Sequence, residues 1–431
     1  MPTTRRAFLS RTAFPALATV AIGPNPSRLL DVLATAQNTP ASALARDEEF
    51  WREIQAAFTV DRSLVNLNNG GVSPSPAYVQ DAVSVHQAFS NKAPSYTMWQ
   101  VLEPQREGVR QRLARTFGCD AEEIALTRNA SEGLQILQNG IDLQRGDEVL
   151  TSTHDYGRMV NTFKQRERRE GIVLKQFDLP VPAEDVDALV RLYLDNVTPK
   201  TRLALIPHVV NLTGQIMPVK PIVEALRQRD IPVIVDGAHS FAHFPFTQAD
   251  LGCDYYATSL HKWLFAPHGT GMLYVRREKI PEVWPLTAAA ERQTDDIRKF
   301  EEIGTHPAAP YLAVAEALTF HEGIGAERKA ERLRYLMTYW VERVQDLPGV
   351  TLYTSMDPRF SCGIGTVGID GQEPGPIATH LFDRHRIITV PIVAPNVSGL
   401  RVSPSVYTTL EELDRFADAF TRIVREGVPQ G

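Results

Sequence analysis

The sequence predicts a doubly wound α/β domain followed by a smaller α+β domain. Between about residues 105 and 325, short and nearly continuous apolar runs alternate with helical patterns, which is typical of buried, mostly parallel strands. After a long helical stretch at 311–347, two further runs and a terminal helix at 409–426 indicate the smaller domain. In order, the runs are EIALT, DEVLTS, LALIPHVV, PVIVDGA, YYATS and GMLYV, and then GIGTVGI and RIITVP.

The composition is that of an ordinary globular protein and argues against two classes of function. The 431 residues include 45 Lys or Arg and 51 Asp or Glu, which gives a formal net charge of −6. A mildly acidic chain without a basic run lacks the positive surface that binds nucleic acid, so no such partner is expected. The mean hydropathy of −0.19 argues against a membrane bundle. Three cysteines are too few for a disulfide framework.

The first 36 residues are predicted to be a twin-arginine-type signal peptide, with export to the periplasm as the expected outcome. Arg5 and Arg6 precede an apolar stretch at 13–23, which is shorter than the roughly 20 residues that a membrane span requires. The run Ala34-Thr35-Ala36 supplies the small residues of a signal peptidase site. A disordered basic tail is the alternative. The predicted organisation is a signal peptide at 1–36, an N-terminal segment at 37–75, a large domain at 76–310 and a small domain at 311–431.

A lone lysine follows one of the predicted strands. Lys262 lies in SLHKWLFAPHGTG, between the run YYATS and a Gly-rich return. Taken alone, a lysine is usually a surface residue. If buried, its pKa falls and its lone pair is free to form an imine with an aldehyde such as that of pyridoxal phosphate (PLP). Lys262 is therefore a candidate Schiff-base lysine.

Asp236 and His239 follow the apolar run at 231–235. A carboxylate at the end of a buried strand needs a cationic partner, and the protonated ring nitrogen of PLP is one. This pairing keeps the ring an electron sink, although a turn or helix-cap role is the alternative for Asp236. His239 is positioned to donate to the phenolic oxygen of the cofactor, with an ordinary core histidine as the alternative.

A strand-to-helix turn at 126–134 carries small polar residues. The free backbone N–H groups and the dipole at such a helix start suit a phosphate, and Ser131 adds a hydroxyl donor. The alternative is a capping box in which Asn129 caps the helix and Glu132 is its partner. The sequence therefore predicts either a phosphate turn or a simple helix cap at this position.

Together, these segments closely resemble the class V aminotransferase family of fold-type I PLP enzymes, from about residue 65 to the C-terminal helix. The motifs HKWLFAPHGTG and LNNGGVSP are most similar to the isopenicillin N epimerase-like branch. The resemblance implies that Lys262 is the Schiff-base lysine, that Asp236 pairs with the pyridine nitrogen and that His239 contacts the phenolic oxygen. The further cofactor contacts that it implies are Ala130, Ser131, Asn211, Ser259 and His261.

The resemblance also implies contacts to the substrate and to a second subunit. Arg401, in GLRVS, falls on the arginine that grips a substrate carboxylate through a bidentate fork, and Asn68 is also expected to bind substrate. The resemblance leaves open whether His154 or Tyr156 stacks on the cofactor ring. Thr305 ends FEEIGT, which resembles a segment that reaches the phosphate of the neighbouring subunit. A homodimer with shared active sites follows from that match.

The leading hypothesis is a PLP-dependent enzyme that acts on an amino acid or related amine through an external aldimine. Lys262 would then move the α-proton as general acid and base, in epimerase, lyase or transaminase chemistry. A cysteine desulfurase or C–S lyase is the alternative within the family. Its nucleophilic cysteine is absent from the predicted loop at 391–398, and the three cysteines that are present look structural: Cys119, Cys253 and Cys362.

Two hypotheses from other classes stay open. A non-catalytic PLP-binding protein would share the cofactor residues but would not respond to amines. A metal-dependent hydrolase could use Asp236, His239 and His243, because the two histidines have the i, i+4 spacing of a helical metal pair. No Glu accompanies this pair in an HExxH arrangement, and the phenylalanines and proline nearby make a regular helix doubtful.

Overall fold

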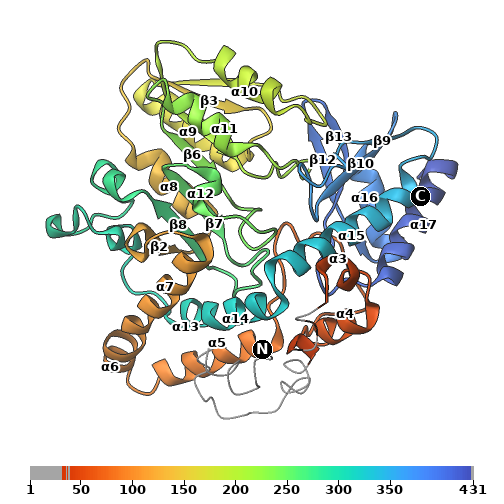
Figure 1. Cartoon of the computed structure of the whole chain (residues 1–431), viewed down its shortest axis with the longest axis horizontal. Coiled ribbons are helices and arrows are strands. Elements are labelled where there is room, and N and C mark those ends of the chain that lie inside the picture. Colours follow the sequence, from red (N-terminus) through yellow and green to blue (C-terminus); the bar gives the residue numbers. More distant parts are fainter. Residues whose placement is uncertain (1–31, 35, 37–38, 429–431) are drawn as a thin grey trace.

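Figure 1 shows the computed structural model of the chain, which describes residues 32–34, 36 and 39–428. A large domain, drawn from orange through yellow to green, lies beside a smaller domain drawn in blue. Helix α15 (Ala326–Val344) runs between the two. The predicted two-domain α/β architecture is therefore confirmed.

The large domain is built on a seven-stranded sheet with the order β2-β8-β7-β6-β5-β3-β4. The neighbours from β7 across to β4 pair in parallel, and β8 is antiparallel to both of its neighbours. The sheet is thus mostly parallel, as the sequence predicts. Its strands are β2 (Ile124–Thr127), β3 (Glu148–Ser152), β4 (Val173–Phe177), β5 (Thr201–Pro207), β6 (Val233–Asp236), β7 (Tyr255–Ser259) and β8 (Gly271–Val275).

Both faces of this sheet are buried, which is why its central strands are nearly continuous apolar runs. Successive residues of a strand point to opposite faces, and Leu205 and Ile206 of β5 accordingly pack into different core clusters. Ile234 and Val235 of β6 do the same. The helices between the strands are α8 (Ala130–Gly140), α9 (Gly157–Glu170), α10 (Val186–Asp195), α11 (Val219–Arg227) and α12 (Gln248–Leu251).

Strand β4 is not predicted from the sequence, and its position explains why. It lies at one edge of the sheet and pairs only with β3. Its sequence VLKQF contains two polar residues, and only Phe177 is buried. An edge strand that is covered incompletely does not need the apolar run by which buried strands are recognised.

The small domain is a four-stranded antiparallel sheet with the order β12-β13-β10-β9. Helices α15, α16 (Pro374–His385) and α17 (Leu410–Glu426) share one core cluster with it, in which Trp340 and Phe416 pack edge to face. Strand β9 and helix α16 are additions to the predicted elements. The strands are β9 (Val350–Leu352), β10 (Gly365–Ile369), β12 (Val390–Ala394) and β13 (Val397–Val402).

The start of the small domain differs from the prediction. Helices α13 (Ala309–Leu312) and α14 (Val314–Ile324) contribute Tyr311 and Leu318 to the core of the large domain. Gly325, with a φ of 90°, separates α14 from α15. Residues 311–318 therefore pack with the large domain, although the prediction assigns them to the small one.

The segment 391–398, predicted to be a loop, is mostly a β-hairpin. Strands β12 and β13 pair antiparallel up to Ala394 and Val397, with a tight turn between them. Asn396 in this turn has a φ of 60°, a left-handed conformation that asparagine tolerates better than most residues. The prediction was wrong because this edge strand carries a proline and exposed positions, which are loop-like in sequence.

The N-terminal segment joins the small domain across a long sequence distance. Strand β1 (Val65–Asn66) pairs in parallel with β11 (Ile387–Ile388). Leu67 lies in the core cluster of the small domain, and the backbone N–H of Asn69 donates to the carbonyl of Ser403 at 3.1 Å. The end of the predicted segment at 37–75 is therefore part of the small-domain fold.

Two residues of the predicted signal peptide are buried in the structure. Leu33 and Ala36 each expose only 4% of their surface and lie in a core cluster with Trp51 of α4 (Glu48–Gln55). Leu33 packs closely against Gly323, where an added Cβ would lie 2.9 Å from Leu33 Cδ1. Cleavage directly after Ala36 would remove two buried side chains. The predicted twin arginines lie outside the described residues.

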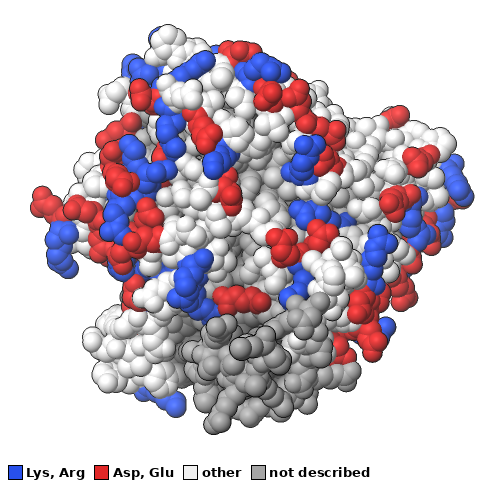
Figure 2. All heavy atoms as spheres, viewed as in Figure 1, with Lys and Arg blue, Asp and Glu red and all other residues white. Residues whose placement is uncertain are grey.

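The charged side chains are mixed over the visible face of the molecule. Figure 2 shows acidic and basic residues interspersed there, and no large region of one sign appears on that face. Within the described part of the chain, no helix has both the length and the apolar character needed to cross a membrane.

We expect Gly133 of α8 to be required for packing against the sheet. A Cβ at this position would lie 2.8 Å from Ala257 Cβ and 3.4 Å from Leu273 Cβ. Gly133→Ala should lower the free energy of unfolding by about 1–3 kcal/mol, because overpacking outweighs the gain in helix propensity. Gly108 in α7 (Arg106–Phe117) has nothing within 4 Å of its Cβ position, so Gly108→Ala should be neutral or stabilising. Chemical denaturation measures both variants, and an equal change in the free energy of unfolding for Gly133→Ala and Gly108→Ala would contradict this prediction.

Candidate active site

A cavity of about 610 Å³ lies at the carboxyl ends of strands β5, β6 and β7. Ligands of open α/β sheets bind at this edge, because the loops that follow the strands converge there. Asp236 and Ser259 are the last residues of β6 and β7, and both line the cavity. The other predicted site residues in the lining are Ala130, Ser131, Tyr156, Asn211, His239, His261, Lys262 and Arg401.

Lys262 lies in the cavity wall three residues after β7. Its Nζ is 3.1 Å from Nε2 of His239. The pKa of Lys262 is lowered to about 8, because the effect of burial, to which Arg401 adds, outweighs the opposing effect of Asp236. Without these surroundings a lysine amine is almost entirely protonated at neutral pH. A lysine of this kind can act as a nucleophile or exchange a proton close to neutral pH.

Asp236 and His239 lie on the turn that follows β6. The Asp236 carboxyl accepts a hydrogen bond from the Ala238 N–H at 2.9 Å, and burial raises its pKa. Burial lowers the pKa of His239 well below its usual value, so the ring is neutral. Its Nδ1 is buried and has no hydrogen-bond partner among the described residues. Both side chains therefore have capacity left for a cation or a polar group of a ligand.

The turn before α8 forms a helix cap but not the predicted capping box, and its phosphate role stays a prediction. Asn129 caps the helix by accepting from the Glu132 N–H at 2.9 Å, but Glu132 binds Arg128 and does not complete a capping box. The Ala130 N–H donates to Ser259 Oγ at 3.0 Å, which ties the turn to the end of β7. Ser131 lines the cavity beside it. The helix start thus faces the same space as Lys262.

Of the two residues predicted as alternatives for stacking, only Tyr156 lines the cavity. Tyr156 is 41% exposed, and its hydroxyl is close enough to affect the pKa of Arg401. His154 is 1% exposed, and its Nε2 lies 2.8 Å from the carbonyl of Pro395 in the hairpin turn. Stacking on the cofactor ring stays a prediction for both residues. Tyr156 borders the cavity directly, whereas His154 is buried against the hairpin turn.

Arg401, on β13, brings a guanidinium from the small domain into the cavity. Nη2 donates to Asn68 Oδ1 and Nη1 donates to the Asn211 carbonyl, each at 2.9 Å. Nε is buried and has no partner within the described residues. Burial lowers the pKa of Arg401 to about 10, whereas an ion pair would raise it. Asn68 holds Arg401 but is not part of the cavity lining, so its predicted contact with substrate stays a prediction.

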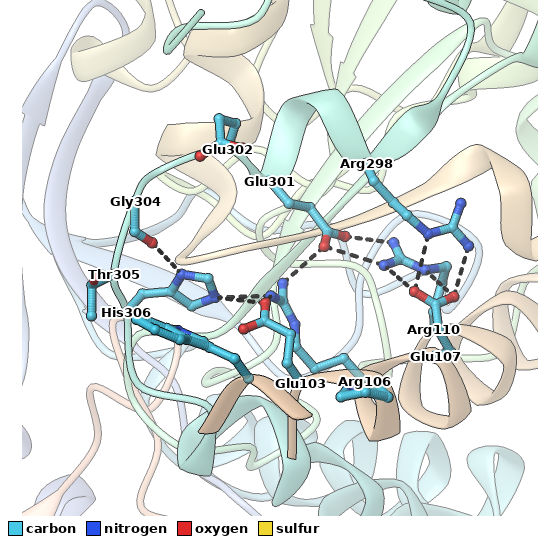
Figure 3. A pocket seen from close by; sticks show the side chains of 12 residues that line it. Glu103, Arg106, Glu107, Arg110, Arg298, Glu301, Glu302, Gly304, Thr305 and His306 are labelled. Atoms are coloured by element: carbon cyan, nitrogen blue, oxygen red, sulfur yellow. Dashed lines mark hydrogen bonds and ion pairs between the residues drawn. The ribbon is translucent and has the colours of Figure 1, made fainter. Parts of the chain in front are cut away.

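Thr305 lies at a second hollow of about 520 Å³, whose lining shares no residue with the first (Figure 3). Glu301 is the centre of an ion-pair network there, between Arg106 and Arg110. It also accepts from the Leu126 N–H at 2.6 Å, which fixes the segment before Thr305 against β2. Within its own chain, Thr305 therefore does not reach the Lys262 cavity, and its contact with a neighbouring subunit stays a prediction.

His239 and His243 do not form the predicted metal pair. Nδ1 of His243 donates to the His239 carbonyl at 2.8 Å, and Nε2 accepts from the Gly363 N–H at 2.9 Å. Both nitrogens are therefore occupied by backbone groups, and the segment is a turn and not a helix. No cluster of three or more His, Cys, Asp or Glu in the described ranges is placed to hold a metal ion.

None of the three cysteines lies in the lining of the cavity. Burial raises the pKa of Cys119, Cys253 and Cys362 to about 12 in each case. Their thiols are thus protonated at neutral pH, and a thiol is a far weaker nucleophile than a thiolate. The structure therefore places none of these cysteines as a nucleophile for the cavity.

The cavity residues fit PLP. Lys262 supplies an amine with a lowered pKa for the aldehyde, and Asp236 supplies a buried carboxylate at the end of β6. The start of α8, with Ser131 and Ser259, supplies donors for a phosphate. The buried Nδ1 of His239 is one polar atom of the lining that no described residue satisfies. The lysine, the carboxylate and the hydrogen-bond donors for a phosphate therefore all line the same cavity.

Comparison with known proteins decides the family. A family model described as Aminotransferase class-V matches residues 65–416. The chain belongs to this family. It is 30% identical over 393 residues to isopenicillin N epimerase of Streptomyces clavuligerus, covering 87% of this chain and 99% of the relative. It is 26% identical over 438 residues to a cysteine desulfurase of Pectobacterium atrosepticum, covering 96% and 97%.

The fold of this class V aminotransferase family member is also found in solved structures. A complex of the cystine C-S lyase C-DES with its product cysteine persulfide superposes with a TM-score of 0.75 at 24% identity, covering 84% of this chain and 98% of that one. The chain therefore has the fold-type I architecture and is a PLP-dependent enzyme of the epimerase-like branch. The alternatives of a non-catalytic PLP-binding protein and a metal-dependent hydrolase are set aside.

Several residues of the class V site were not singled out from the sequence. Gly70, Gly71, Arg158 and Leu286 line the cavity with the predicted residues. The glycines lie in the LNNGGVSP motif, which is the one signal that could have indicated them. Leu286 comes from the long connection after β8, which carries no recognisable pattern.

We expect PLP capture by the cofactor-free class V enzyme to depend on pH through Lys262. Only the neutral amine attacks the aldehyde, so the rate should rise with pH around a midpoint near 8 and not near 10.5. Absorbance of the bound cofactor measures this rate. Lys262→Ala should abolish the adduct that borohydride fixes, whereas Lys164→Ala, at an exposed position of α9, should not. A fixed adduct on another lysine would contradict the assignment.

Proposed function

We propose that this enzyme acts on an amino acid or a related amine that carries a carboxylate. The observation that carries the proposal is Arg401, a buried arginine with no acidic partner among the described residues, which faces the same cavity as Lys262. A buried guanidinium without a counter-ion is costly, and a substrate carboxylate would supply that charge. Lys262 and Arg401 line one cavity, so an α-amino acid bound there would place its amine and its carboxylate near these two side chains.

The chain contributes binding and proton transfer to this reaction. PLP, when bound, supplies an electron sink for the charge that is left at the substrate carbon. Asp236 and Arg401 line the cavity, where Asp236 would stabilise a positive charge at the ring nitrogen and Arg401 would bind the carboxylate. Lys262, with a pKa of about 8, is suited to take and return the α-proton. His239, 3.1 Å from Nζ, orients the amine.

Proton transfer at the α-carbon is the favoured chemistry, as in epimerisation or transamination. The similarity to isopenicillin N epimerases supports it. A desulfurase route through an enzyme persulfide is disfavoured, because the β12–β13 hairpin carries no cysteine and the thiols elsewhere in the chain have raised pKa values. Among lyase reactions, an elimination that needs no cysteine nucleophile remains compatible with the site.

Arg401→Ala should weaken the binding of a carboxylate-bearing amine by roughly 2–5 kcal/mol, because a desolvated charge loses its partner. The change in the cofactor spectrum on titration with amino acids measures the affinity. Arg401→Lys should recover only part of the loss, since an ammonium cannot reproduce the planar fork.

The matched control for this prediction is the decarboxylated amine, whose binding should be almost unaffected by Arg401→Ala. Arg422→Ala, on α17, should leave the binding of both ligands unchanged. If Arg401→Ala bound the carboxylate amine as tightly as the parent does, the substrate role would be wrong even with PLP in place.

We also propose a homodimer in which Thr305 of one subunit reaches the cofactor phosphate of the other. Support comes from the resemblance of FEEIGT to a shared family segment, and from the position of Thr305 outside the cavity of its own chain. In analytical ultracentrifugation, we expect the protein to sediment with twice the 48.0 kDa mass of one chain.

Export through the twin-arginine signal is a further proposal, and it is compatible with loading of PLP before translocation. Changing Arg5 and Arg6 to Lys should retain the protein in the cytoplasm with residues 1–36 attached. Fractionation and mass spectrometry of the N-terminus measure both effects. Equal export of the double variant, or a secreted protein that still begins at Met1, would contradict the proposal. Leu33 and Ala36 are buried, so the mature N-terminus also shows whether processing removes these two packed side chains.

A further inference from the structure

His243 is a buried residue near the site to which the reaction assigns no role. It is 1% exposed and does not line the cavity. Its ring nitrogens bind the His239 carbonyl and the Gly363 N–H, at 2.8 and 2.9 Å. A carbonyl can only accept and an N–H can only donate, so Nδ1 carries the proton and Nε2 does not. The backbone thus fixes one neutral tautomer of His243.

The flat face of the same ring supports the residue that follows Lys262. The rings of His243 and Trp263 stack with centroids 3.7 Å apart and an angle of 4° between their planes. Trp263 is fully buried, and its carbonyl accepts from the amine of Lys329 on α15. The backbone after Lys262 is therefore fixed on two sides, by an aromatic ring and by a helix that joins the two domains.

Gly363 connects His243 to the small domain. It lies two residues before β10, and a Cβ there would be 3.0 Å from His243 Nε2 and 3.1 Å from Leu333 Cβ. The close approach that lets its N–H reach the imidazole therefore leaves little room for a side chain at this position. One ring thus contacts three parts of the chain: the turn of His239, the segment of Lys262 and the entry to β10.

We propose that His243 is a positioning residue that holds His239 and Lys262 in their mutual geometry and ties both to the small domain. It acts on the turn through the carbonyl of His239 and on the lysine through Trp263. The inference rests on the proposed role of Lys262 and is independent of the identity of the substrate.

Two conservative variants separate the two hydrogen bonds of His243. The side-chain nitrogen of Asn superposes on Nδ1, so His243→Asn can still donate to the His239 carbonyl. The side-chain oxygen of Gln reaches the position of Nε2, so His243→Gln can still accept from Gly363. His243→Phe keeps a stacking ring and loses both bonds. His321 on α14, also buried, provides the matched control His321→Phe.

The measurement is the rate at which each cofactor-free variant captures PLP on Lys262, beside its unfolding midpoint. We expect His243→Phe to slow capture at least tenfold and to shift the absorption of the bound cofactor, and His321→Phe to change neither. His243→Asn should restore the rate to within about threefold of the parent, and His243→Gln should restore less. The bond that Asn keeps holds His239, whose ring lies 3.1 Å from Lys262 Nζ, whereas the bond that Gln keeps holds Gly363 of the small domain. The absorption shift is a signal that a purely structural role would not produce.

Specific outcomes would overturn the inference. Capture by folded His243→Phe within twofold of the parent would do so, and so would an equal loss in His321→Phe. If His243→Phe fails to fold, the comparison of Asn with Gln decides, and equal rates for these two would contradict a link through His239. Absence of a Lys262 adduct in the parent enzyme would instead refute the proposed role of Lys262.

Discussion

The site depends on the position of the Lys262 amine. Water cannot solvate its charge fully there, and Asp236 is the one carboxylate in the described part of the chain that compensates for it. Burial and Arg401 lower the pKa of this amine, while Asp236 raises it, and the balance lies at about 8. A closer carboxylate would keep the amine protonated, and a wetter cavity would have the same effect. The rigid ends of β6 and β7 set this balance, because they fix Asp236 and the lysine segment on adjacent strands.

Much of this arrangement could be predicted from sequence because it follows from strand ends. Asp236 and Ser259 each terminate a buried apolar run, and Lys262 comes three residues later, so the topology of a parallel sheet brings them to one edge. The buried strands were recognisable for the same reason. Where burial is incomplete, as in β4 and the β12–β13 hairpin, the pattern weakens and the prediction failed.

Contacts between distant segments could not be predicted. Arg401 is held by Asn68 and by the carbonyl of Asn211, and no local pattern reveals that these three meet. His243 looked like half of a metal pair by spacing, whereas its nitrogens bind two backbone groups. Tertiary packing gave each of these residues its role, so the resemblance to a family could indicate Arg401 but not its supports.

The pairing of β1 with β11 has a consequence for how the chain reaches its native state. Val65 and Leu67 bond to the carbonyls of Arg386 and Ile388, more than 300 residues later. During synthesis the large-domain strands can associate as they emerge, but β1 has no partner until almost the whole chain is made. Closing so long a loop is slow, so completion of the small domain, and with it the seating of Arg401, should be a late step in folding.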